Sequence, residues 1–309
     1  MRYGYLGPEG TFTEAALRLL PPGAGPVEPV GFPTVQAALA AVRDQSVDRA
    51  VVALESSVEG IVTATVDNLA AGDLMVLSEL QLPIAFALLT AGPAGLPDIK
   101  TVGGHPHALA QCRRWLHEHL PHAEQIPAAS NGEGARRVAE GGLDAALAGA
   151  FAADKYGLTI AADNVQDSAV AVTRFVEVSR AGEPLPAPTS ADRTSIAVFL
   201  GEDHAGALME ILTEFAVRGI NLTTIQSRPT GSGLGSYYFF IDCEGHVDDA
   251  RVGEALMGLR RVCGDVRFLG SYPRSDGGAT QVRPGTSDHE FAEAAAWLGR
   301  LRYGPPATR

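Results

Sequence analysis

The chain has 309 residues, 46% of them hydrophobic, and its 36 Asp and Glu residues outnumber its 24 Lys and Arg residues. This length predicts about two domains, and the formal charge of −12 argues against nucleic acid or an anionic membrane as the partner. The first residues contain no signal-peptide core, no apolar stretch is long enough for a membrane span, and the three Cys residues lack metal-ligand spacing, so we expect a cytoplasmic protein with reduced thiols and without a bound metal.

Residues 1–180 alternate between strand-like and helix-like patterns. A short apolar segment at 2–6 predicts the first strand, and Thr11 and Glu14 have the spacing of a capping box at the start of a helix. Further strands are expected at 75–80, 84–89 and 145–148, and further helices after Thr34, at 108–120 and on both sides of the strand at 145–148. This alternation predicts an α/β fold with a mostly parallel sheet.

The most informative segment combines a buried strand with a polar end. Residues 50–54 are apolar, and Glu55, Ser56 and Ser57 follow them directly. Such a run is typical of a parallel strand buried on both faces, and open α/β sheets bind ligands at the carboxyl ends of their strands. The two hydroxyls and nearby backbone N–H groups are suited to an anion, and Glu55 to orienting donors or handling a proton. The alternative is an ordinary helix N-cap, for which Ser is favoured.

Two other segments place polar residues beside apolar ones. Arg174 lies within the apolar strand 170–178, where a cation requires a partner, either an anionic ligand or an internal carboxylate. Strand alternation points Thr173 away from Arg174. His105 and His107 precede a helix, and residues two apart on a helix do not face the same way, so solvated surface histidines are favoured over a metal site.

The second half of the chain predicts a separate unit. Residues 181–193 are rich in proline and are expected to form a linker. Strands are expected at 194–200, 220–228, 236–243 and 265–269, and helices at 208–215 and 252–259. The resulting order, βαββαβ, is ferredoxin-like.

Three features of this half bear on assembly and ligand binding. Residues 237–241 are apolar on both faces, so one face is expected to pack on the helices and the other to need a cover, most simply another chain. The helix that begins at Gly206–Leu208 could bind a carboxylate if it faces a neighbouring chain, or the segment could be ordinary capping. Residues 273–309 predict a tail with one amphipathic helix that docks on a core.

Taken together, these segments resemble bacterial prephenate dehydratase with a C-terminal ACT regulatory domain, over about residues 1–272. The markers are Gly7–Glu14, Glu55–Gly60, His105–Cys112, Thr173–Phe175, Gly206–Leu208, Arg218–Leu222, Ser227–Pro229 and Leu269–Pro273. Each is short, but their order and spacing are specific. The chain departs from the family at Ser56, Gly104 and Ala171, where Asn, Ser and Asn are usual, and at Gln226, where Glu is usual.

The resemblance implies a catalytic domain at residues 1–180, with two lobes like a type II periplasmic binding protein, the second at about 80–160. The active site would lie between the lobes. The implied activity is that of a carbon–oxygen lyase that converts prephenate to phenylpyruvate, water and CO₂ in L-phenylalanine synthesis. No cofactor is expected, because formation of an aromatic ring drives the reaction. The implied catalytic residues are Thr173 and Glu55, and the implied substrate-binding residues are Thr11, Ser56, Ser57, Gln111, Arg174 and Phe175.

The resemblance also implies feedback by L-phenylalanine through an ACT domain at 194–272, in a homodimer or homotetramer. The implied effector-binding residues are Gly206, Ala207, Leu208, Asn221, Leu222, Ser227, Arg228 and Pro229. Three alternatives remain at this point: an arogenate dehydratase, a prephenate decarboxylase that does not dehydrate, and a non-catalytic amino-acid sensor.

Overall fold

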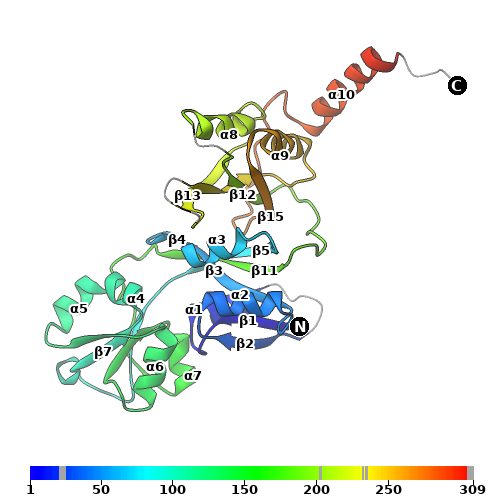
Figure 1. Cartoon of the computed structure of the whole chain (residues 1–309). Helices are drawn as coiled ribbons and strands as arrows, with labels where there is room; N and C mark the ends of the chain where they lie inside the picture. The colour runs from blue at the N-terminus through cyan, green and yellow to red at the C-terminus, as the bar shows by residue number, and fades with distance from the viewer. Residues whose placement is uncertain (21–25, 202–203, 232, 234–235, 305–309) are drawn as a thin grey trace. The chain divides into compact units, whose positions relative to one another are not determined.

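The computed structural model describes residues 1–20, 26–201, 204–231, 233 and 236–304, and the chain divides into two compact units (Figure 1). Unit 1 contains Met1–Asn68 and Leu80–Arg180, and unit 2 contains Leu69–Glu79 and Ala181–Arg309. Among the helices in the described ranges, none is both long enough and apolar enough to cross a membrane.

The first lobe of unit 1 is built on a mixed sheet with strand order β2-β1-β3-β11-β5, in which β4 pairs with β3; residues 74–79 of β5 are counted with unit 2. The strands are β1 (Arg2–Leu6), β2 (Glu28–Phe32), β3 (Arg49–Ser56), β4 (Gly60–Ile61), β5 (Leu74–Pro83) and β11 (Val172–Arg180), and the helices are α1 (Phe12–Leu19), α2 (Val35–Arg43) and α3 (Thr63–Leu69). β1 runs parallel to β2 and β3, whereas β11 runs antiparallel to β3.

The second lobe has its own mixed sheet, with strand order β10-β6-β9-β7-β8. Its strands are β6 (Ala87–Thr90), β7 (Thr101–Gly104), β8 (Glu124–Pro127), β9 (Ala145–Ala148) and β10 (Thr159–Ala162), and its helices are η1 (Leu96–Asp98), α4 (Pro106–Gln111), α5 (Arg113–His119), α6 (Asn131–Ala139) and α7 (Phe151–Tyr156). β7 is parallel to β8 and β9, but β6 is antiparallel to β9 and β10. The prediction of a two-lobed α/β fold is confirmed. The prediction of a mostly parallel sheet was wrong, because β6 and β10, which enter and leave the second lobe, run antiparallel to their neighbours.

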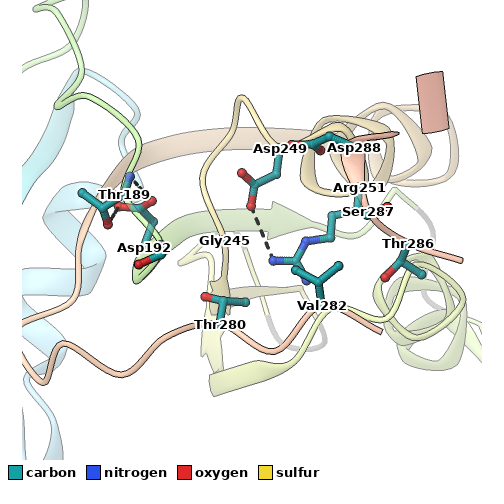
Figure 2. Close-up of a pocket in the computed structure, with 11 residues that line it drawn as sticks. Thr189, Asp192, Gly245, Asp249, Arg251, Thr280, Val282, Thr286, Ser287 and Asp288 are labelled. Carbon is teal, nitrogen blue, oxygen red and sulfur yellow. Dashed lines mark hydrogen bonds and ion pairs between the residues drawn. The ribbon is translucent and has the colours of Figure 1, made fainter. Parts of the chain in front are cut away.

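Unit 2 contains a four-stranded antiparallel sheet with strand order β13-β14-β12-β15, and two helices. Its elements are β12 (Asp192–Phe199), α8 (Ala207–Ala216), β13 (Leu222–Pro229), β14 (Tyr237–Glu244), α9 (Ala250–Val262) and β15 (Asp265–Pro273). The predicted βαββαβ order is confirmed. One sheet face and both helices enclose an apolar core that includes Ile196, Ile211, Phe215, Ile241 and Leu259. Figure 2 shows a different part of unit 2, around the start of α9 at Asp249 and Arg251.

The opposite face of this sheet is covered in part by residues 69–79 of the same chain. Tyr238 and Phe240 on that face are 3% and 0% exposed. Arg193 Nη1 lies 2.8 Å from Glu79 Oε2, and both side chains are buried. A Cβ at Gly270 would lie 2.2 Å from the carbonyl oxygen of Val76, so the two backbones are in close contact. The expectation that this face requires another chain as its cover was therefore wrong for these residues.

The tail helix α10 (Asp288–Tyr303) forms as predicted but does not dock on a core. Its N-terminus has a complete capping box between Ser287 and Glu290, and no residue of the helix is buried. Trp297 and Leu301 are 55% and 65% exposed. The Asp288 carboxylate accepts a hydrogen bond from the Ala250 N–H at 2.8 Å, which holds only the first turn to α9.

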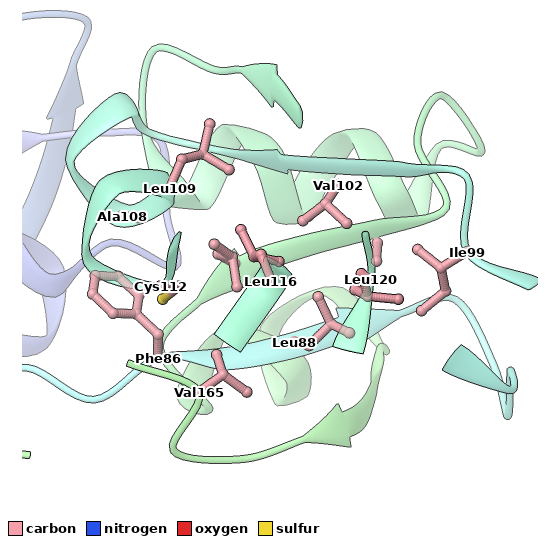
Figure 3. Close-up of a cluster of buried hydrophobic side chains, with 12 residues drawn as sticks. Phe86, Leu88, Ile99, Val102, Ala108, Leu109, Cys112, Leu116, Leu120 and Val165 are labelled. Carbon is pink, nitrogen blue, oxygen red and sulfur yellow. The ribbon is translucent and has the colours of Figure 1, made fainter. Parts of the chain in front are cut away.

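The helix predicted at 108–120 is two helices, α4 and α5, separated at Cys112. Cys112 has φ −111° and ψ 13°, outside the helical region. The Asp167 carboxylate accepts hydrogen bonds from the N–H groups of Arg114 and Trp115, and so caps α5 from a distant loop. The apolar spacing survives the break because Cys112 and Leu116 both stay in the buried cluster of the second lobe (Figure 3). Burial raises the pKa of the Cys112 thiol to about 12.

Candidate active site

A cavity of about 470 Å³ in unit 1 is lined by residues of both lobes. Its polar lining consists of Thr11, Thr13, Ser56, Glu59, Thr63, His105, His107, Gln111, Ser130, Asn131 and Thr173, and its aromatic lining of Phe12, Phe86 and Phe175. No Lys or Arg is among these lining residues, and Glu59 is the only carboxylate. The cavity therefore has room for a small organic molecule, but no side chain of fixed positive charge lines it.

Four helices begin at this cavity and supply positive potential in place of cations. Thr11, His105 and Ser130 are the N-cap residues of α1, α4 and α6, and all three line the cavity. Thr63, the first residue of α3, lines it as well. Unpaired N–H groups and the helix dipole make such termini favourable for anions. The cavity is thus suited to a ligand with carboxylate groups.

Thr173 reaches the cavity because the pairing of β3 with β11 contains a bulge. Thr173 lies opposite Ser56, but Phe175 lies opposite Ala53, so the register skips Leu54. All four paired residues line the cavity. Bulges change the direction of side chains and are frequent next to active sites. The Thr173 hydroxyl has no hydrogen-bond partner among the residues that the structure describes.

Glu55 and Arg174 are brought together on the other side of the strand pair and do not line the cavity. Arg174 Nη2 lies 3.1 Å from Glu55 Oε2, with the side chains 5% and 37% exposed. Of the two partners considered for the buried cation, an internal carboxylate is therefore present. The pair ties Glu55 to the residue next to Thr173.

The two predicted serines fix the backbone around this strand end. The Ser56 hydroxyl accepts hydrogen bonds from the N–H groups of Val58 (3.2 Å) and Glu59 (3.4 Å), closing the turn that brings Glu59 to the cavity. Ser57 donates its N–H to the Val172 carbonyl at 2.8 Å and accepts the Val172 N–H on its hydroxyl at 2.9 Å. Ser56 lines the cavity and Ser57 does not.

The other predicted substrate residues, Thr11, Gln111 and Phe175, line the cavity. The Thr11 hydroxyl is already used in the fold, since it donates to the Leu6 carbonyl and accepts from the Glu14 N–H. Gln111 is the last residue of α4, and its carbonyl accepts the Asp167 N–H at 2.7 Å. The helix break described above therefore also positions Gln111.

Several cavity residues were not predicted to bind substrate, among them Glu59, His105 and Asn131. The His105 N–H donates to Asn131 Oδ1 at 2.9 Å, which joins the starts of α4 and α6. Burial lowers the pKa of His105, and the neighbouring His107 lowers it further, while Glu59 acts in the opposite direction. The Ser130–Glu133 spacing of a capping box was a usable sequence signal for the start of α6. No group of three or more His, Cys, Asp or Glu side chains suited to a metal occurs in the described ranges.

The predicted effector residues lie in unit 2 as two separate groups. Gly206 is the N-cap of α8, with φ +99°, and Leu208 is 40% exposed. Leu222, Ser227, Arg228 and Pro229 belong to β13, an edge strand, and Asn221 precedes it. A cavity of about 220 Å³ at the start of α8 is lined by Ala207, His204 and Cys263 among others, but by no residue of β13.

Comparisons with known proteins point to one family. The prephenate dehydratase family model matches residues 3–183, and the ACT domain model matches residues 194–261. A prephenate dehydratase of Mycobacterium tuberculosis is 48% identical over 314 residues, covering 99% of this chain and 95% of that protein.

Solved structures agree with this result. The crystal structure of a prephenate dehydratase from Arthrobacter aurescens in complex with L-Phe has a TM-score of 0.91 and 47% identity, covering 98% of this chain and 100% of that one. A structure described as a novel type of quorum-quenching acylase, GqqA, is also similar, with a TM-score of 0.79 and 28% identity, covering 89% of this chain and 98% of that one.

The low pKa of His105 predicts an acid-labile contribution to stability. The folded chain holds the imidazole below its ordinary pKa of about 6.5, so this contribution is present above that pH and is lost as the pH falls toward the folded value. We expect the urea midpoint of His105→Gln to fall less than that of the wild type between about pH 7.5 and about pH 5. Equal losses in the two proteins would contradict the assignment, and the exposed His117→Gln serves as the matched control.

Proposed function

The chain belongs to the prephenate dehydratase family, and on this premise we propose that it converts prephenate to phenylpyruvate, water and CO₂ as a carbon–oxygen lyase of cytoplasmic L-phenylalanine synthesis. The observation that carries the proposal is the Thr173 hydroxyl, which lines a cavity between the two lobes and has no hydrogen-bond partner among the described residues. Thr173 is the residue that the family motif identifies as catalytic.

The lining of the cavity suits the charge and the apolar ring of prephenate. This substrate carries two carboxylates and a six-membered ring. The starts of α1, α3, α4 and α6 offer N–H groups and positive helix ends for the carboxylates. Phe12, Phe86 and Phe175 offer apolar surface for the ring. Binding a dianion without Lys or Arg in the lining avoids burying fixed cations when the site is empty.

The reaction needs one proton and no redox partner. Loss of CO₂ leaves the electron pair of the broken C–C bond in the ring, and the C–O bond to the ring hydroxyl breaks as the aromatic system forms. The leaving hydroxide takes up a proton and becomes water. Thr173 donates a hydrogen bond to that hydroxyl, and the proton itself comes through a stronger acid or water, because a threonine hydroxyl is a poor acid.

The structure supports different roles for the two glutamates. Glu55 pairs with Arg174 and holds the strand segment that carries Thr173, so we assign it a positioning role. Glu59 lines the cavity and influences the pKa of His105, so it is the carboxylate better placed to take part in proton transfer. Ser56, Gln111 and Thr11 would contact the bound substrate. Ser57 and Arg174 lie outside the cavity lining and would support the strands that form it.

We also propose feedback inhibition by L-phenylalanine at an interface between ACT domains. The L-Phe complex of the Arthrobacter aurescens protein supports this effector. The start of α8 and strand β13 would then come from neighbouring chains, which agrees with their separate positions in unit 2. The effector-binding set remains Gly206, Ala207, Leu208, Asn221, Leu222, Ser227, Arg228 and Pro229.

Thr173→Ala should lower kcat with prephenate by roughly 10²–10⁴-fold and leave KM nearly unchanged, because positioned proton assistance is lost. Thr173→Ser retains the hydroxyl and is expected to keep most of the activity. Steady-state assays that follow phenylpyruvate from prephenate, and phenylalanine from arogenate, identify the substrate. An enzyme that is inactive with both substrates would overturn the proposed function.

Glu59→Gln and Glu55→Gln should distinguish a residue that takes part in the reaction from one that stabilises the fold around Thr173. We expect Glu59→Gln to lower kcat and change its pH profile with little change in stability. Glu55→Gln leaves the buried Arg174 without one carboxylate, and we expect it to reduce the free energy of unfolding by about 1–3 kcal/mol. Thermal unfolding and pH–rate profiles of both variants provide the test. The assignment fails if the two variants exchange these effects.

Ser227→Ala should weaken inhibition by L-phenylalanine and spare activity without the effector. A coupling of about 1–3 kcal/mol predicts that saturating L-phenylalanine changes the apparent substrate affinity of the wild type by roughly 5–150-fold. Thr213→Ala, which removes an exposed hydroxyl of α8 outside the effector set, is the control and should stay inhibited. Full inhibition of Ser227→Ala would remove β13 from the site, and L-tyrosine is tested in parallel because of Gln226.

We expect a homodimer or homotetramer in solution. Edge strand β13 presents Ile225, and α8 presents Leu208 and Met209, with 43%, 40% and 66% of their surfaces exposed. An unpaired edge beside exposed apolar side chains favours association. Light scattering at micromolar concentration checks the mass, and a monomer would count against an interface-bound effector.

A further inference from the structure

A third cavity, of about 280 Å³, lies within unit 2 and shares no residue with the proposed active site or the proposed effector set. It is formed by the turn before β12 at Thr189–Asp192, by the start of α9 at Asp249–Arg251, and by the segment 280–288 that leads into α10. Figure 2 shows these three parts of the chain around the Arg251 side chain.

Arg251 is a buried cation with hydrogen-bonding capacity left over. The residue is 3% exposed. Its Nη2 lies 3.4 Å from Asp249 Oδ2, a long contact, and its Nη1 is buried without a hydrogen-bond partner among the described residues. The Thr280 hydroxyl, which lines the same cavity, is also buried and without a partner there. Unsatisfied buried donors are costly, and here two of them border one space large enough for a ligand.

The three carboxylates of the lining already have donors of their own. Asp192 accepts from the N–H and the hydroxyl of Thr189 at 2.6 and 2.7 Å. Asp249 accepts from the His246 N–H, and Asp288 from the Ala250 N–H. These aspartates therefore belong to the fold. They outnumber the one guanidinium in the lining, so a ligand with net negative charge is disfavoured.

These observations restrict the chemistry of the ligand. It must bring a strong acceptor to Arg251 Nη1, because that donor is charged. The N-termini of α9 and α10, helices of 13 and 16 residues, meet the cavity at Asp249 and Ser287 and favour a carboxylate as that acceptor. The ligand must also carry a positive charge that offsets its own carboxylate and meets the aspartates.

We propose that this cavity is a binding site for a small zwitterion of the α-amino acid class. The ligand carboxylate accepts from Arg251 Nη1 and from the Thr280 hydroxyl, and its ammonium group lies toward the aspartates. The hydroxyls of Ser190, Thr286 and Ser287 favour a short polar side chain. The site is independent of the proposed L-phenylalanine site in residues and in place within the ACT half.

Isothermal titration calorimetry of the full-length protein with L-serine tests the proposal. Excess L-phenylalanine is present, so that the proposed effector residues are occupied. We expect one L-serine per chain for the wild type and for Arg260→Met, an exposed position on the same helix. Arg251→Met and Thr280→Val should each bind more weakly, the former by at least about tenfold. No heat with the wild type, or unchanged affinity in Arg251→Met despite a native thermal transition, overturns the site.

Parallel titrations define the ligand class. Acetate supplies the carboxylate alone, methylammonium the cation alone, and inorganic phosphate a second type of oxyanion. The proposal requires all three to bind at least about tenfold more weakly than L-serine, because each lacks one half of the zwitterion. Phosphate or acetate binding as tightly as L-serine would show a general oxyanion site and overturn the amino-acid assignment.

Discussion

The pairing of β3 with β11 is the constraint on which the proposed active site depends. These strands are far apart in the sequence, and the bulge at Leu54 decides which of their side chains face the cavity and which face away. Thr173 and Ser56 are directed to one side, while Glu55 and Arg174 meet on the other. The reciprocal bonds between Ser57 and Val172 fasten the open end of the pair. A partly buried ion pair and the two hydrogen bonds between Ser57 and Val172, one of them to the Ser57 hydroxyl, thus hold the strand pair that carries Thr173.

The second organising principle is how an acidic protein handles anionic ligands. With a formal charge of −12, the chain creates local positive potential from backbone dipoles, because four helices begin at one cavity. Fixed cations are kept for places where carboxylates of the chain compensate them, as at Arg174 and Arg193. Arg251 differs from both in its longer contact with a carboxylate, 3.4 Å to Asp249, and in lining a cavity of its own.

Patterns local in sequence predicted much of this molecule. Hydrophobic periodicity led to the right elements, because it reports burial directly. It identified the apolar strand before Glu55, the apolar strand that contains Thr173, and the βαββαβ order of the second half. The errors arose from contacts that no local window contains. Asp167, in a loop some fifty residues away, caps α5 and so splits the predicted helix into two. The bulge in β3 places Glu55 on the opposite face from the one that simple alternation suggests. Glu59 and His105 enter the cavity through turns whose geometry the composition does not reveal, and α10 has the pattern of a docking helix without a surface to dock on.

Residues 69–79 belong to unit 2 by their contacts, although the sequence places them inside the catalytic half. The proline-rich linker suggests that the regulatory half is a separable domain. The contacts show instead that this half includes a segment from within the catalytic half. A chain cut within residues 181–193 would yield an ACT fragment in which Arg193 has lost Glu79 and Gly270 has lost its backbone contact with Val76. Modular exchange of such regulatory domains between proteins would therefore have to carry two separate pieces of sequence, and a gene fusion at the linker alone would transfer an incomplete domain.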